Sequence, residues 1–320
     1  MKAAVEPVRK PCFQGVLRAY EKMSAILPPT PIKRCKIDGR TIWCKAESLQ
    51  PIGAFKVRGA WHRLTDLTKA ERDAGVVAFS SGNHAQGVAW AAARLGIAAT
   101  IVIPRDAPKL KIDATRALGA EIILYDRMTE DRAALAARIA AERGATLVPS
   151  YDDPWIIEGQ GSAGIEIRKQ LRREPNLVVS PCGGGGLASG LVLALPNTRI
   201  AIAEPEGWDD MAHSLAIGHI VTVGPNPPAT ACDALMTLRV APLTFSVLHE
   251  RGVKGVAVTE GEVAAAMRFA HDKLALKIEP GGAVGLAAVL ANKIAPVGET
   301  VVILSGGNVE PALFEAMIKR

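Results

Sequence analysis

The stretch SPCGGGGLASG (180–190) places four consecutive glycines between two apolar segments. NLVVS (176–180) before them suits a short buried strand, and LASGLVLAL (187–195) after them suits a helix. Consecutive glycines lose much backbone entropy on folding, so a chain that contains them brings its backbone close to another group. A strand, a glycine turn and a helix N-terminus together place free N–H groups at one point. That geometry is typical of a phosphate-binding site.

Three kinds of site compete for this glycine turn. The phosphate loop of nucleoside triphosphatases is excluded, because no Gly-Lys-Ser or Gly-Lys-Thr follows the glycines. A dinucleotide-binding turn is harder to dismiss. Gly183, Gly185 and Ala188 fit G-x-G-x-x-A, and Glu204 ends the next expected strand, where an acid would bind a ribose. A glycine-rich packing turn without a ligand is the third interpretation.

Short apolar runs alternate with alanine-rich amphipathic segments along most of the chain. The expected strands are GVVAFS (75–80), ATIVIP (99–104), EIILYD (121–126), NLVVS (176–180), RIAIAEP (199–205) and TVVILSGG (300–307). Such runs, joined by helices, predict parallel strands covered on both faces, the α/β class. We expect residues 71–150 to form a small α/β domain, inserted into a large domain of residues 1–70 and 151–320.

The composition is that of a globular chain of enzyme size, with 320 residues, 49% apolar and 22% charged. The net charge of +6 is not gathered into a basic stripe with interleaved aromatic residues, so we expect no nucleic-acid partner. No apolar run reaches membrane-spanning length, and MKAAVEPVRKPCF (1–13) lacks the apolar core of a signal peptide. Five cysteines without a C-x-x-C pair favour reduced thiols and a cytoplasmic protein.

Three further motifs carry polar groups suited to chemistry. SLQPIGAFKVRGA (48–60) contains Lys56, SSGNHAQG (80–87) lies at a strand-to-helix junction, and LSGGNVE (304–310) follows a strand. Ligands in open α/β sheets bind at the carboxyl ends of strands. A lysine, several hydroxyls and a phosphate cradle at such ends indicate a phosphorylated carbonyl cofactor bound covalently to Lys56.

The chain resembles the fold-type II pyridoxal-phosphate (PLP) enzymes, in the group of serine/threonine dehydratases and serine racemases. AFKVRGA, SSGNHAQG, CGGGGL, IEPGGA and LSGGNV match the family's motifs in the family's order, with Ala54 where serine is commoner. The resemblance runs from about Thr30 to the end of the chain. It implies a tryptophan synthase β-like fold with two parallel-sheet α/β domains, PLP as cofactor and a homodimer. A nicotinamide-dependent dehydrogenase becomes a remote alternative.

The resemblance also implies how PLP is held. Lys56 would form the Schiff base and then take the α-proton of the substrate, although a lone lysine is usually a surface residue. The phosphate would be bound by the amides of Gly183, Gly184, Gly185, Gly186 and Leu187. Phe55 would pack against the pyridine ring and Asn83 would bind its phenolic oxygen.

Ser305 would face the nitrogen of the pyridine ring. A neutral hydroxyl at this place leaves the ring a weaker electron sink than a carboxylate would, which suits β-elimination. The alternative for Ser305 is a hydroxyl that caps the following helix.

A substrate site is implied next to the cofactor. The substrate carboxylate would be received by Ser80, Ser81, Asn83 and His84. Ser81 is also the position that acts on the opposite ring face in racemizing relatives, so its presence permits racemization without requiring it. Arg132 could bind the distal carboxylate of 3-hydroxyaspartate. An exposed arginine on a helix is the competing interpretation, and the one that the pattern favours.

The segment AEPEGWDD (203–210) resembles the family's cation site. Glu204, Asp210 and the carbonyl of Trp208 would offer oxygen ligands, which suit Mg²⁺, Mn²⁺ or Ca²⁺. An acidic turn that caps a helix is the alternative.

These residues together predict a PLP-dependent ammonia-lyase. Its substrate would be a small β-hydroxy amino acid such as threonine, serine or 3-hydroxyaspartate, and its products a 2-oxo acid and ammonia. A serine or aspartate racemase on the same scaffold is the nearest alternative. Ala234 replaces the glycine of the family's usual ADG stretch, which puts the substrate preference in doubt.

Overall fold

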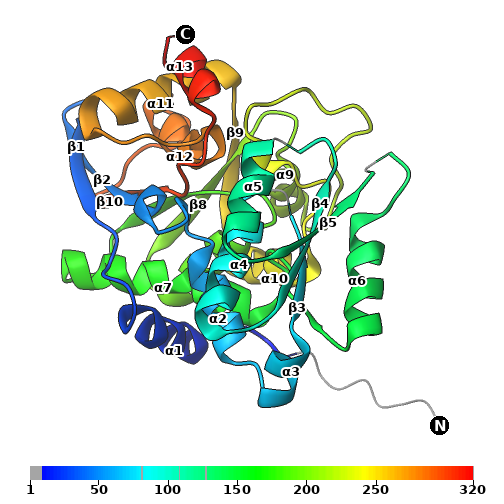
Figure 1. Ribbon diagram of the computed structural model, residues 1–320. Coiled ribbons are helices and arrows are strands. Elements are labelled where there is room, and N and C mark those ends of the chain that lie inside the picture. The colour runs from blue at the N-terminus through cyan, green and yellow to red at the C-terminus, as the bar shows by residue number, and fades with distance from the viewer. Residues whose placement is uncertain (1–8, 81, 108, 127, 320) are drawn as a thin grey trace.

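The computed structural model describes residues 9–80, 82–107, 109–126 and 128–319 (Figure 1). Its strands form two sheets. The larger sheet has the order β1-β2-β10-β7-β8-β9, with β1 (Ile32–Ile37), β2 (Arg40–Ala46), β7 (Leu177–Pro181), β8 (Arg199–Pro205), β9 (Lys254–Val258) and β10 (Thr300–Leu304). The smaller sheet has the order β5-β4-β3-β6, with β3 (Val76–Phe79), β4 (Ala99–Pro104), β5 (Glu121–Tyr125) and β6 (Thr146–Leu147).

Helices connect most of these strands. In chain order they are α1 (Phe13–Ser24), η1 (Glu47–Leu49), α2 (Val57–Thr65), α3 (Lys69–Ala74), α4 (Asn83–Leu95), α5 (Lys109–Ala117), α6 (Arg132–Arg143), α7 (Pro154–Leu171), α8 (Gly186–Ala194), α9 (Asp210–Ile217), η2 (Asp233–Leu235), α10 (Pro242–Glu250), α11 (Glu260–Leu274), α12 (Pro280–Leu290) and α13 (Pro311–Ile318).

The α/β class and the six expected strands are confirmed. Every strand pair is parallel except β1 with β2, which form an antiparallel hairpin. The hairpin closes at Asp38 and Gly39, with φ of 47° and 78°, values that the sequence Asp-Gly readily adopts. This signal, and the apolar run of β9, went unused in the sequence analysis. The division into residues 1–70 with 151–320 and residues 71–150 stays a prediction.

Both faces of the larger sheet are covered by helices. One apolar cluster joins the sheet to α11, α12 and α13, and another joins it to α1, α7, α8 and α10. Figure 1 shows α11, α12 and α13 on one side of the sheet and α1 and α7 on the other. The smaller sheet is likewise packed against α2, α4 and α5 on one face and against α6 on the other. Continuous burial on both faces explains why the parallel strands have continuous apolar sequences.

Helix α7 supports both segments that the motifs single out. A Cβ on Gly159 would lie 2.5 Å from Cα of Gly59 in α2, and a Cβ on Gly190 of α8 would lie 2.4 Å from the amide nitrogen of Gly161. Backbones approach this closely only where side chains are absent. Helix α2, which follows Lys56, and helix α8, which follows the glycine turn, therefore both pack closely against α7.

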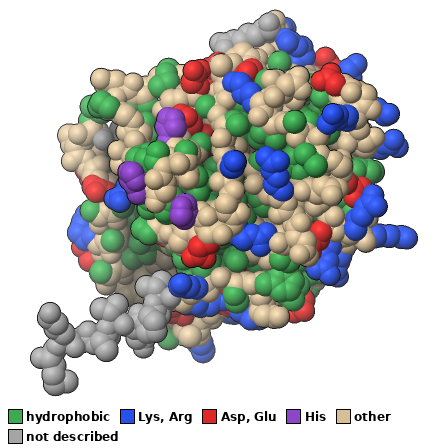
Figure 2. Space-filling view, turned by 180° about the vertical axis from the view of Figure 1, so that it is seen from behind, with side chains coloured by type: hydrophobic (Ala, Val, Ile, Leu, Met, Phe, Trp, Pro, Cys, Tyr) green, Lys and Arg blue, Asp and Glu red, His purple; other side chains and the backbone are tan. Residues whose placement is uncertain are grey.

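On the face seen in Figure 2, basic side chains are scattered among acidic and uncharged ones. None of the helices in the described ranges has the length and apolar character needed to span a membrane.

Candidate active site

A cavity of about 540 Å³ lies where the motifs meet. Its walls come from the ends of β3, β7 and β10, the glycine turn, the two residues before α2, and the first residues of α4 and α6. The sequence-predicted residues that line it are Phe55, Lys56, Ser80, Asn83, His84, Arg132, Gly183, Gly184, Gly185, Gly186, Leu187 and Ser305. Segments more than 200 residues apart in the chain thus contribute to one space.

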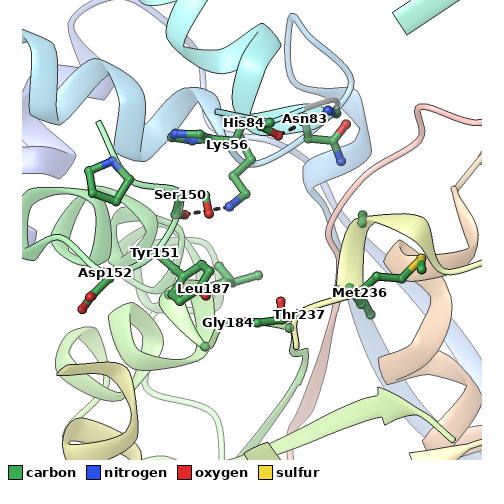
Figure 3. Close-up of a pocket in the computed structure, with 18 of the residues that line it drawn as sticks. Lys56, Asn83, His84, Ser150, Tyr151, Asp152, Gly184, Leu187, Met236 and Thr237 are labelled. Atoms are coloured by element: carbon green, nitrogen blue, oxygen red, sulfur yellow. Dashed lines mark hydrogen bonds between the residues drawn. The ribbon is translucent and has the colours of Figure 1, made fainter. Parts of the chain in front are cut away.

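Lys56 occupies the N-cap of α2 and points into this cavity (Figure 3). Its Nζ donates a hydrogen bond of 2.8 Å to the carbonyl of Ser150, and lies 5.3 Å from the centre of the Phe55 ring. Burial lowers the pKa of the Lys56 amine to about 8. Nucleophilic attack on an aldehyde requires a neutral amine. Near pH 7 an amine of this kind is neutral far more often than that of an exposed lysine.

The glycine turn presents free donors to the same cavity. Within the part of the chain that the structure describes, the amides of Gly183, Gly184, Gly186 and Leu187 donate no hydrogen bond to another residue. Gly185 has φ of +85°, a conformation that favours glycine, and α8 begins directly after it. Amides at a helix N-terminus that lack partners fit the phosphate of PLP.

Two further predicted cofactor residues flank the lysine. The side-chain amide of Asn83 donates a hydrogen bond of 2.7 Å to Oε1 of Glu279, and its oxygen accepts one of 2.7 Å from Nδ2 of Asn308. One N–H of this side chain is left for a ligand. Ser305 is 5% exposed and follows β10, and its carbonyl accepts from the amide of Phe55 at 3.1 Å. That bond ties the end of β10 to the segment that carries Lys56.

The predicted substrate residues lie at the start of α4 and α6. The Nε2 atom of His84 lies 2.9 Å from the carbonyl of Val148, and burial, assisted by the nearby Lys56, lowers the pKa of His84 to about 3. The ring is therefore neutral and, with its proton on Nε2, presents an acceptor at Nδ1. Arg132 is exposed at the cavity, 5.8 Å from the ring centre of Phe79. Ser81 lies outside the described residues.

The cavity also contains residues that the sequence analysis did not assign. Tyr151 lies against the glycine turn, since a Cβ on Gly184 would come within 2.3 Å of its ring (Figure 3). Glu279 is buried, and this burial raises its pKa to about 8. Lys111 of α5 forms an ion pair with Asp233 of η2, and both line the cavity. The position of Glu279 in the IEPGGA motif was a usable signal, whereas the other three follow from the fold.

The predicted cation residues lie outside the cavity lining, from the end of β8 to the first residue of α9. Glu204 is wholly buried, and its Oε2 accepts 2.8 Å from the amide of Ala212. Its Oε1 and both carboxylate oxygens of Asp210 have no hydrogen-bond partner among the described residues. Burial raises the pKa of Glu204 well above its ordinary value and that of Asp210 to about 6.

No cluster of three His, Cys, Asp or Glu side chains suited to a metal occurs within the described ranges. The candidate therefore consists of two carboxylates and, as the sequence predicts, the Trp208 carbonyl. Buried oxygens without partners fit a hard cation.

The chain is similar to several known enzymes. The family model described as pyridoxal-phosphate dependent enzyme matches residues 24–306. L-threo-3-hydroxyaspartate ammonia-lyase of Saccharomyces cerevisiae is 38% identical over 317 residues, covering 96% of each chain. L-threonine ammonia-lyase of Thermotoga maritima is 40% identical, covering 89% of this chain and 71% of that protein. The structure of maize serine racemase superimposes with a TM-score of 0.89 at 34% identity, covering 97% of this chain and 98% of that one.

The chain belongs to the family of pyridoxal-phosphate dependent enzymes. The expected fold-type II architecture and family are confirmed, and PLP is the cofactor that the family uses. The dehydrogenase alternative is thereby set aside.

Proposed function

We propose that this enzyme is an ammonia-lyase that converts a small β-hydroxy amino acid to a 2-oxo acid and ammonia. The observation that carries the proposal is the shared cavity, into which the buried Lys56 amine and the free amides of the glycine turn both open. The two ammonia-lyases that the chain resembles at 38% and 40% identity support the reaction class.

In the proposed reaction, residues of the cavity would hold PLP and move the protons. Bound PLP supplies an electron sink that acidifies the α-carbon of the substrate. Amides 183–187 would hold its phosphate, and Ser305 would face its ring nitrogen with a neutral hydroxyl. Nζ of Lys56, with a pKa of about 8, is suited to take the α-proton as a general base. The β-hydroxyl would then leave with a proton.

The first candidate substrate is 3-hydroxyaspartate, ahead of threonine and serine. Its α-carboxylate would meet Ser80 and Asn83 at the N-terminus of α4, where the helix dipole favours an anion. Its second carboxylate would be bound by Arg132, which lines the same cavity from α6. A relative named for this substrate matches the chain over nearly its full length.

A racemase is the second candidate function. The similarity to maize serine racemase favours it, and Ser81 would then act on the ring face opposite Lys56. The two functions predict different products from one substrate, since elimination of L-serine gives pyruvate and racemization gives D-serine.

A substrate panel tests the proposal. The enzyme is incubated with isomers of 3-hydroxyaspartate, L-threonine and L-serine, and 2-oxo acid, ammonia and D-amino acid are measured. We expect oxo-acid release, fastest with a 3-hydroxyaspartate isomer, and loss of turnover and of covalent PLP in Lys56→Ala. Racemization without oxo acid would overturn the lyase assignment. Retention of both properties in Lys56→Ala would overturn the site.

We further propose that a divalent cation binds Glu204, Asp210 and the carbonyl of Trp208. The three partnerless carboxylate oxygens support this, and Mg²⁺, Mn²⁺ and Ca²⁺ prefer such ligands. Because these residues lie outside the cavity lining, the cation would stabilise the fold around β8 and α9 and take no part in the chemistry. A homodimer and a cytoplasmic location stay predictions.

A further inference from the structure

Arg58 follows Lys56 by two residues, and its side chain is wholly buried. Its Nε and Nη2 donate to Glu47 at 2.7 and 2.8 Å. Its Nη1 and Nη2 donate to Glu166 at 2.8 Å each, and Nη1 also donates to Oγ of Ser162 at 3.1 Å. These bonds use all five N–H donors of the guanidinium. The first turn of α2 is thus fastened to η1 on one side and to α7 on the other.

The charges of this Arg58 cluster, made of Lys45, Glu47, Arg58 and Glu166, sum to zero. Lys45 of β2 donates 2.6 Å to Glu166 and is also wholly buried. Burial alone would raise the pKa of Glu47, but the charge and hydrogen bonds of Arg58 lower it to about 2. Burial likewise opposes the charge of Arg58, yet Glu47 and Glu166 together raise its pKa. Glu47 and Arg58 are therefore charged in the folded protein.

Few contacts of its own hold the side chain of Lys56 in place. Its Nζ forms one hydrogen bond, to the Ser150 carbonyl, and no ion pair among the residues that the structure places. The backbone around it is well fixed: the amide of Arg58 donates 3.0 Å to Phe55, and a Cβ on Gly87 would lie 3.0 Å from the carbonyl of Lys56. The position of the flexible lysine side chain thus depends on the first turn of α2.

We propose that Arg58 is a positioning residue, whose five-donor contact with Glu47, Glu166 and Ser162 fixes the first turn of α2 and thereby holds the amine of Lys56 in the cavity. The inference rests on the proposed role of Lys56 as the PLP-binding base. A lysine could not replace Arg58, since an ammonium has three donors and no planar fork to bridge two carboxylates. A displacement of about 1 Å at a reacting group costs roughly 100-fold in rate, so a small shift of this turn matters.

The test compares Arg58→Lys with Lys45→Met in the full-length chain. Both substitutions disturb the same buried cluster, but only Arg58 lies on α2. For each variant, kcat and KM are measured with PLP bound. The pKa of the Lys56 amine is measured in the PLP-free chain by ¹³C NMR after reductive methylation, with Lys56→Ala to assign the signal. Thermal unfolding gives the loss of stability.

We expect kcat of Arg58→Lys to fall about 10- to 100-fold with a smaller change in KM. The Lys56 amine should titrate near its ordinary value of 10.5, instead of about 8, as it leaves the buried site. Lys45→Met should lose stability while keeping kcat and the Lys56 titration of the wild type. The proposal is wrong if Arg58→Lys leaves the titration near 8, or if Lys45→Met shifts it equally.

Two provisions keep the outcome decisive. If Arg58→Lys does not fold, Glu47→Gln, which loosens the same guanidinium, is judged by the same measurements and the same criteria. If the wild type releases no oxo acid from any substrate, the proposed function fails, yet the Lys56 titration still decides the role of Arg58.

Discussion

Two pairs of buried carboxylates in this protein have opposite surroundings. Glu47 and Glu166 both pair with Arg58, Glu166 also pairs with Lys45, and the pKa of Glu47 falls to about 2. Glu204 and Asp210 form no ion pair with any described residue, and burial raises the pKa of both. The residue type and the degree of burial are similar, so the difference comes from the presence of a fixed cation.

This difference in surroundings indicates a different role for each pair of carboxylates. A buried carboxylate needs a positive partner or a proton, because desolvation of a lone charge costs several kcal/mol. The Arg58 cluster supplies its partners from the chain itself and can serve as a rigid support. The Glu204–Asp210 pair lacks such partners, which supports the cation site that we propose there.

The largest expected effect comes from removing Arg58, the positive side chain that Glu47 and Glu166 share. Arg58→Met leaves Glu47 and Glu166 with Lys45 alone, and we expect a loss of about 3–5 kcal/mol in the free energy of unfolding. Arg138→Met serves as control, since the exposed ion pair of Arg138 with Glu142 contributes at most about 1 kcal/mol. Urea unfolding of both variants gives the values. Equal losses in the two variants would show that the buried Arg58 cluster contributes no more to stability than an exposed ion pair.

Glu279 sharpens the comparison as a third buried carboxylate without an ion pair in the described ranges. Burial, reinforced by the charge of Asp233, raises its pKa to about 8, against the opposing effects of Asn83 and Lys111. The folded state therefore holds this proton more tightly than the unfolded chain. Its contribution is fully present below about pH 4.5 and is lost as the pH rises through 8.

Substituting Glu279→Gln should remove this pH dependence. We expect the wild type to lose on the order of 3 kcal/mol between pH 5 and pH 9 relative to the variant. Unfolding by urea at a series of pH values measures the difference. Parallel pH profiles for the two proteins would show that Glu279 is ionised in the folded state, like Glu47.

A bound divalent cation should supply the positive partner that the Glu204–Asp210 pair lacks. After treatment with EDTA, added Mg²⁺, Mn²⁺ or Ca²⁺ should raise the unfolding free energy by about 2.7 kcal/mol at 100 times its Kd. Glu204→Gln should abolish this gain, whereas Glu206→Gln, an exposed neighbour, should keep it. Thermal unfolding with and without metal provides the measurement. An equal gain in both variants would place the cation elsewhere.

The sequence was sufficient for the parts of the site that lie within single motifs. Lys56, the glycine turn, Asn83 and Ser305 each stand in a recognisable segment, and the rule that ligands bind at strand ends correctly gathers them. The partners of Arg58 could not be predicted in this way. Glu166 lies 108 residues further along the chain, and its carboxylate reaches Arg58 only because α7 packs against α2 through glycines. Tyr151 likewise gains its place through tertiary packing.

The smallest expected effect comes from comparing two buried serines, one that contacts Arg58 and one that contacts the backbone of Asp210. Ser162 and Ser214 are both wholly buried, but Ser162 accepts from the charged Arg58 whereas Ser214 accepts from the amide of Val221. Hydrogen bonds to charged groups contribute about 1.5–3 kcal/mol and neutral ones about 0.5–1.5 kcal/mol. Ser162→Ala should therefore be less stable than Ser214→Ala by about 1 kcal/mol in urea unfolding. If Ser214→Ala loses as much, the guanidinium does not depend on its fifth acceptor, and the two carboxylates alone hold the first turn of α2.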